Sequence, residues 1–232
     1  QTARGVGKDT EGESGEEALL EELEGYVTGV ELEFTPRAVA NMMRTFCDLR
    51  RLRGDVREAL EAYCLVHVER FRSNEIAKVL YACASAGQVD TPLFRALEGR
   101  IQHVAAFFTP MEVALLAWSY ASSGNRSKSV FTALRAQLPR AAPAMNAQDV
   151  TTTLWAFAAA GYAARPVLNI LRPVVLTNLG AFNQQDIGTT ARAFSYASCL
   201  DTRLCAALTA HALRQADRLS PHSMAALAGA FG

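Results

Sequence analysis

The most constraining feature of this sequence is an internal repeat of 37 residues that recurs with no insertion or deletion. The segment from Met145 to Gly161 shows the unit most clearly. With Met145 as position 1, the same position is apolar in six copies: Phe34, Phe71, Phe108, Met145, Phe182 and Leu219. Positions 6 and 13 are apolar in every copy too, and position 17 is Gly87, Gly124 and Gly161, with Arg50 and Ser198 as exceptions. A fixed period of this length predicts a solenoid.

Each unit has the pattern of a helical hairpin. The first half opens with a helix-start signal, as in Thr109-Pro-Met-Glu112 and Asn146-Ala-Gln-Asp149. A side-chain oxygen caps a free amide there, and an acid follows in the first turn. Apolar residues at positions 6, 9, 10 and 13 keep the spacing of a one-sided helix, and glycine at position 17 ends it. The second half repeats the pattern from about position 21 to 35, so the predicted fold class is all-α, an α-solenoid of tandem 37-residue helical-hairpin repeats.

The 37-residue register also divides the chain. The expected parts are an acidic disordered tail at 1–15, the second helix of a partial repeat at 16–33, repeats at 34–70, 71–107, 108–144, 145–181 and 182–218, and the first helix of a truncated repeat at 219–232. Pro139 and Pro143 are expected to shorten the second helix of the third repeat, and Pro173 to kink that of the fourth.

The distribution of charge favours a polyanionic partner. Net charge is zero, but residues 1–33 carry two basic and ten acidic side chains, whereas residues 34–232 carry 21 basic and 13 acidic ones, a net charge of +8. The five cysteines show no CxxC or Cys/His spacing and are interpreted as small core residues, so no metal is expected. No apolar run approaches the ~18–20 residues of a membrane span.

Catalysis finds little support in the sequence. The four histidines are scattered without a Ser, Cys or carboxylate partner at a recognisable spacing, and no P-loop, GxGxxG or paired-carboxylate signature is present. We therefore predict a protein that is not an enzyme and that holds no cofactor.

The repeat motif resembles those of two organellar families. Leu80-Tyr-Ala-Cys-Ala-Ser-Ala-Gly87, Ala117-Trp-Ser-Tyr-Ala-Ser-Ser-Gly124 and Leu154-Trp-Ala-Phe-Ala-Ala-Ala-Gly161 are similar to the heptatricopeptide repeats of apicomplexan and related organelles, and also to the octotricopeptide repeats of green algae, whose unit is about one residue longer. The resemblance covers residues 34–232. It implies a helical-hairpin solenoid that binds organellar RNA, and some members of these families are parts of mitochondrial ribosomes. No RAP-like segment, which often ends such proteins, is present.

Stacked hairpins would align positions 4, 8, 11 and 15 of successive first helices in parallel rows. Cations in these rows could neutralise phosphates and amides could pair with base edges. Tyr81, Trp118 and Trp155 could stack on bases, although rings at helical spacing more often pack than bind. Together with two basic clusters outside the rows, the candidate RNA-binding residues are Arg37, Asn41, Arg44, Arg50, Arg51, Arg53, Asn74, Lys78, Arg126, Lys128, Arg135, Arg140, Gln148, Thr152, Gln185 and Arg192.

The first functional hypothesis is a non-catalytic RNA-binding or scaffolding protein of an organelle. We expect a mitochondrial location, with a plastid as the alternative, and a structural role in a mitochondrial ribosome, holding single-stranded or loop segments of rRNA beside other ribosomal proteins. The alternatives are a dissociable RNA-stability or translation factor and a protein–protein adaptor. An adaptor would use the acidic segment 16–33 and the apolar pair Met111 and Leu115 as contacts.

Overall fold

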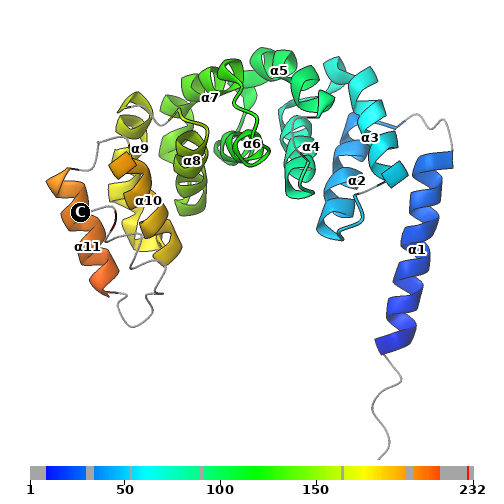
Figure 1. Ribbon diagram of the computed structural model, residues 1–232, viewed down its shortest axis with the longest axis horizontal. Coiled ribbons are helices and arrows are strands. Elements are labelled where there is room, and N and C mark those ends of the chain that lie inside the picture. Colours follow the sequence, from blue (N-terminus) through cyan, green and yellow to red (C-terminus); the bar gives the residue numbers. More distant parts are fainter. Residues whose placement is uncertain are drawn as a thin grey trace, which may run out of the picture.

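The computed structural model describes residues 9–29, 34–52, 54–88, 91–162, 165–196, 201–214 and 229. These residues form an arch of two helical layers (Figure 1). The layer on the concave side holds α2 (Pro36–Asp48), α4 (Ser73–Ser85), α6 (Pro110–Ser122), α8 (Ala147–Ala159) and α10 (Gln184–Tyr196). The outer layer holds α3 (Gly54–Val66), α5 (Pro92–Val104), α7 (Lys128–Ala141), α9 (Arg165–Asn178) and α11 (Thr202–Arg214), and α1 (Asp9–Gly29) packs beside α3 at the N-terminal end. The predicted all-α solenoid is confirmed.

The helices of the inner layer repeat with the period of the sequence. Each of the five is 13 residues long and runs from position 3 to position 15 of its unit. Capping explains the common start: the Thr109 side chain accepts from the amide of Glu112 while the Glu112 carboxylate accepts from the amide of Thr109, and Asn146 and Asp149 form the same box. Short 3-10 turns end the first four units (Val68–Arg70, Ala105–Phe107, Ala142–Ala144 and Leu179–Ala181).

In the four repeats where the structure describes position 17, its backbone has one conformation whether or not the residue is glycine. Gly87, Gly124 and Gly161 have φ of 76°, 72° and 82°, and Arg50 takes the same left-handed conformation at 58°. Glycine adopts it without steric cost, whereas an L side chain is strained there. Arg50 thus differs from the three glycines in residue type but not in backbone conformation, and Ser198 lies outside the described residues.

The core lies between the layers and is built from the repeated apolar columns. Position 27 is a leucine in every complete repeat, at most 1% exposed. These leucines are Leu60, Leu97, Leu134, Leu171 and Leu208. At position 1, Phe71, Phe108, Met145 and Phe182 are also buried. Each hairpin therefore buries its apolar residues against the neighbouring hairpins, as repeat architectures require.

Outer-layer side chains also bind the carbonyl of position 1. The guanidinium of Arg100 donates to the Phe71 carbonyl at 2.9 Å, and that of Arg140 donates to the Phe108 carbonyl at 2.7 Å. The Tyr63 hydroxyl donates in the same way to Phe34, and the His211 Nε2 to Phe182 at 3.0 Å. These four contacts, which we call the carbonyl clamps, satisfy a backbone acceptor just outside the first helix of a unit.

Two expectations concerned prolines in the outer-layer helices. The predicted shortening by Pro139 and Pro143 is wrong, because α7 runs through Pro139 to Ala141 and has 14 residues. Pro139 lies in the exposed last turn, where losing one amide donor costs little. The kink at Pro173 stays a prediction, since the helix α9 continues past it.

The N-terminal helix is longer than expected. α1 begins at Asp9, inside the segment 1–15 that we expected to be a disordered tail. Residues 1–8 and, apart from Gly229, the expected truncated repeat at 219–232 lie outside the described residues. Among the described helices, none combines the length and hydropathy of a membrane-crossing segment.

Candidate nucleic-acid interface

The helices α2, α4, α6, α8 and α10, which carry the predicted rows, line the concave side of the arch (Figure 1). At positions 8 and 11, residues 37 apart in the sequence are in contact. The Lys78 ammonium donates to Asn41 Oδ1 at 2.8 Å, which joins α4 to α2 at position 8. This contact shows that residues at the same repeat position on adjacent inner-layer helices lie side by side in the structure.

The row at position 11 places three aromatic rings between two arginines: Arg44, Tyr81, Trp118, Trp155 and Arg192. The Arg44 guanidinium lies 4.3 Å from the centre of the Tyr81 ring, and the Tyr81 and Trp118 ring centres are 5.1 Å apart at an interplanar angle of 33°. All three rings are half-buried and present a surface to solvent, and those of Trp118 and Trp155 also pack against the buried core. Packing and binding are therefore compatible roles here.

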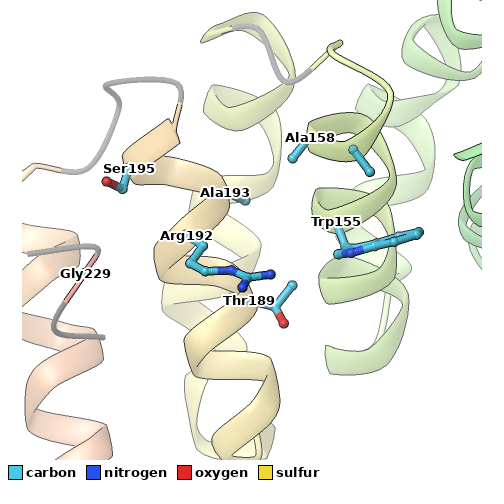
Figure 2. A pocket seen from close by; sticks show the side chains of 8 residues that line it. Trp155, Ala158, Thr189, Arg192, Ala193, Ser195 and Gly229 are labelled. Carbon is cyan, nitrogen blue, oxygen red and sulfur yellow. The ribbon is translucent and has the colours of Figure 1, made fainter. Parts of the chain in front are cut away.

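Two clefts flank Trp155. The smaller, of about 220 Å³, lies toward Trp118 and is lined by Gln148, Thr152 and Gln185 among others. The larger, of about 560 Å³, lies toward α10 and is lined by Trp155, Thr189 and Arg192 among others. Figure 2 shows Arg192 extending from α10 toward α8 and Trp155, with Thr189 beside it. A flat ring, a cation and hydroxyl or amide groups thus converge on one stretch of the face.

The predicted site residues at positions 4 and 8 of the rows are polar and mostly exposed. Arg37, Asn74, Gln148 and Gln185 are exposed at position 4, and Thr152 is half-buried at position 8, where its hydroxyl accepts from Gln148 Nε2 at 3.1 Å. Amide and hydroxyl groups at a solvent-facing surface can exchange such bonds for bonds to base edges. The side chain of Tyr196 at position 15 lies outside the described residues.

The inner face has more positive than negative charge. Arg37, Arg44, Lys78 and Arg192 lie on its rows, and Asp48 is bound there by Arg44 Nε at 3.1 and 2.8 Å. This hydrogen bond raises the pKa of Arg44. The acids that follow the helix starts are buried and cap the helices: Glu75, Glu112, Asp149 and Asp186. Burial raises the pKa of Asp149. The carboxylates named here are thus paired with an arginine or used in helix caps, and the excess of cations on the rows is suited to polyanions.

Two arginines of the basic cluster near residue 50 are paired with carboxylates of the fold. Arg51 pairs with Glu24 of α1 at 3.0 Å, and Arg57 pairs with Glu58 and Glu61 at 3.4 Å. Arg50 is exposed, and Arg53 lies outside the described residues. Much of this positive charge is thus compensated within the fold.

The second basic cluster belongs to the outer layer. Lys128, Arg135 and Arg140 lie on α7, Arg126 lies in the preceding turn, and all four are exposed. Arg140 forms a carbonyl clamp, whereas no ion pair of the other three is found within the described ranges. The structure does not bring this cluster onto the concave rows, and RNA binding by its residues stays a prediction.

Sequence reasoning missed the carbonyl clamps and the contact between Arg51 and Glu24. The clamps leave one signal, namely polar residues such as Arg100 and His211 at position 30 in an otherwise apolar helix face. Groups of three or more His, Cys, Asp or Glu side chains placed to bind a metal ion are not found among the described residues.

Comparison with known proteins places most of this chain in one family. A family model described as RNA-editing substrate-binding complex 6 protein matches residues 26–232, which include every inner-layer helix. A search of curated proteins finds no match.

Proposed function

Because this chain belongs to the family of RNA-editing substrate-binding complex 6 proteins, we propose that it is a non-catalytic RNA-binding subunit of an RNA-editing complex in mitochondria. Its ligand is single-stranded RNA, held along the concave face. Its role is to position a substrate RNA for other components of the complex. The family description supports the editing context, and the chemistry of the inner face supports the RNA.

The row at position 11 is the observation that carries this proposal. Rings that expose one surface can stack on unpaired bases, while the flanking Arg44 and Arg192 neutralise phosphates. The Tyr81 and Trp118 rings are already in tilted contact with each other, so bases add to the open side of the row and do not insert between these two rings. A duplex hides its base faces and cannot use such a platform, which favours single-stranded RNA.

Specificity in this scheme comes from positions 4 and 8. Gln148, Thr152 and Gln185 line the cleft beside Trp155. A base stacked on Trp155 would enter this cleft and meet these side chains. Amides and hydroxyls offer both donors and acceptors to base edges. The cations of the rows set the affinity for RNA, and these amides and hydroxyls make that affinity depend on the RNA sequence.

Salt-dependent binding tests the proposal. With about four phosphates contacted, a plot of log affinity against log salt for a single strand has a slope of about −3. Replacing Arg37, Arg44 and Lys78 together by Gln removes three contacts and reduces the slope by about 2. Fluorescence anisotropy with a labelled single strand and a matched duplex measures both. Equal affinity for both RNAs, or an unchanged slope in the variant, would contradict RNA binding at this face.

The expected place in a mitochondrial ribosome stays a prediction, because the family description names RNA editing and not rRNA. Sedimentation separates the two: an editing subunit runs apart from ribosomal particles, and a ribosomal protein runs with them.

A protein–protein adaptor is the second candidate function. Met111 is 57% exposed in the middle of the concave face, beside the half-buried Leu115, so the rows are interrupted there by an apolar step. This pair is suited to a peptide rather than to RNA. Loss of a protein partner on changing Met111 to Gln, with RNA affinity unchanged, would favour the adaptor.

A further inference from the structure

The larger cleft beside Trp155 extends along the helices and not only across them. On α8 it is lined by Trp155, Ala158 and Ala159, at positions 11, 14 and 15, and on α10 by residues from Thr189 to Ser195. Ala159 is the last residue of α8, so the cleft reaches from the middle of the concave face to the C-terminal ends of two inner helices (Figure 2). The cleft therefore connects the position 11 row with the edge of the arch where inner helices turn into outer ones.

Three exposed cations lie on this edge: Arg126 in the turn before α7, Lys128 at the start of α7 and Arg165 at the start of α9. The Tyr162 hydroxyl donates to the Arg126 carbonyl at 3.1 Å, which holds the turn after α8 against the turn after α6. Lys128 and Arg165 both occupy position 21, and α7 packs against α9. Residues 123–128, 160–162 and 165 thus form one continuous surface, which we call the turn edge.

The charge of the turn edge is positive. α7 and α9 have no acidic side chain in their first turns. The carboxylate of Glu98 reaches the start of α7, where it is half-buried and accepts from the Ser129 hydroxyl at 3.0 Å, and Asp201 pairs with Arg172. Within the described ranges, no ion pair of the three turn-edge cations is found. These cations are therefore available to phosphates.

The corresponding place at the N-terminal end of the arch is less suited to a polyanion. Position 15 is Asp48 at the end of α2, where α8 has Ala159. Asp48 pairs with Arg44, and Arg51 in the following turn pairs with Glu24. A strand leaving the concave face there would meet carboxylates, whereas a strand leaving at α8 meets exposed cations.

We propose that single-stranded RNA leaves the concave face through the cleft between α8 and α10 and crosses the turn edge, where Arg126, Lys128 and Arg165 bind its phosphates. This inference rests on the proposed function and adds a direction to it. The strand follows the position 11 row as far as Trp155 and then turns along α8 toward Ala159.

The turn edge binds the RNA backbone and does not read bases. The Tyr162 ring is half-buried and stacks on Phe131 with 4.8 Å between the ring centres, so its face is not offered to a base. Cations alone contact phosphates of any sequence. The sequence preference of the chain is therefore set on the concave face, and the turn edge adds affinity only for strands long enough to reach it.

Strand length tests this path. Mixed-sequence single strands of increasing length, without self-complementarity, are titrated with the full chain by fluorescence anisotropy at several salt concentrations. We expect affinity to rise with length and then to level off. Three further phosphate contacts should make the salt slope of long strands steeper than that of short ones by about 2.

A matched pair of variants locates the added contacts. Lys128→Gln with Arg165→Gln should weaken long strands about fivefold, reduce their salt slope by about 1.4 and leave short strands unchanged. The control Arg70→Gln with Arg135→Gln removes the same charge from exposed residues outside the turn edge and should leave both lengths unchanged.

A second pair tests the cleft itself. Ala159 and Ala136 are both exposed alanines in helices, but only Ala159 lines the cleft. Ala159→Glu should weaken long strands several-fold, because its carboxylate repels a passing phosphate, and Ala136→Glu should not. Thermal denaturation shows whether each variant is folded as the unchanged chain is.

The outcomes separate the path from the proposed function. No binding of a strand of any length by the unchanged chain would overturn both. Binding without a difference between the two glutamine pairs would overturn the path alone, and so would an equal loss from the two glutamate variants. Equal weakening of short and long strands by the Lys128 and Arg165 changes would also contradict it.

Discussion

The two layers of the arch use the same polar residue types in opposite ways. In the outer layer, Arg100 and Arg140 bind backbone carbonyls and hold the start of an inner helix in place. In the inner layer, Arg37 and Arg192 are exposed on rows that the fold does not need for its own hydrogen bonds. Cationic charge therefore stabilises the hairpins on one side and is available to a ligand on the other. A count of arginines cannot separate these roles, whereas their positions in the repeat can.

The largest effect expected from this comparison concerns burial. Leu134→Ala in the outer layer removes a fully buried side chain and should lower the free energy of unfolding by about 2–5 kcal/mol. Met111→Ala on the inner face, where the side chain is 57% exposed, should change it by less than about 0.5 kcal/mol. Urea denaturation measures both, and similar losses would mean that the inner face is part of the core.

The second prediction concerns stacking. Trp155→Leu keeps an apolar side chain against the core but removes the ring, and should weaken single-stranded RNA binding by about five- to 150-fold, since one stacked base contributes about 1–3 kcal/mol. Phe107→Leu, at an exposed aromatic outside the rows, is the matched control and should leave affinity unchanged. Anisotropy titrations compare the two. Equal effects would remove the special role of the position 11 row.

The local part of this architecture could be predicted from the sequence, and the non-local part could not. Helix starts such as Thr109 follow from caps within four residues, and the apolar columns follow from one period. The pairing of Arg51 with Glu24 joins residues 27 apart, and that of Arg140 with Phe108 joins residues 32 apart. Such contacts depend on how a helix face meets a loop, which the period does not specify.

The same limit applies to charge. The cluster near Arg51 has a high local density of arginine, and both Arg51 and Arg140 of the two predicted clusters have partners within the fold. The thinly spaced cations of the rows, such as Lys78 and Arg192, gather only when helices 37 residues apart are stacked. Proximity in the sequence is therefore a poor guide to a binding surface in a solenoid, and proximity in repeat position is a better one.

The third prediction separates the two uses of arginine. Arg100→Gln should lower the free energy of unfolding by about 1 kcal/mol, because a partly exposed charged donor to a carbonyl is lost, and should leave RNA affinity unchanged. Arg192→Gln should do the reverse, with several-fold weaker RNA binding and unchanged stability. Denaturation and anisotropy on the same samples decide between the roles. If Arg100→Gln weakens RNA binding as much as Arg192→Gln does, the outer layer also contacts RNA.

The smallest effect lies at the turns that join the layers. Arg50 holds a left-handed backbone at φ 58°, where three other repeats have glycine, so Arg50→Gly should stabilise the protein by up to about 1 kcal/mol. Gly161→Ala should cost about 1 kcal/mol from backbone strain alone, because no atom lies within 4 Å of the added Cβ. Thermal and urea denaturation of both variants test whether the two changes have opposite signs. A loss of stability in Arg50→Gly would mean that the Arg50 side chain makes a contribution larger than its strain. Such a loss would extend the structural role of arginine from the outer layer to the turns.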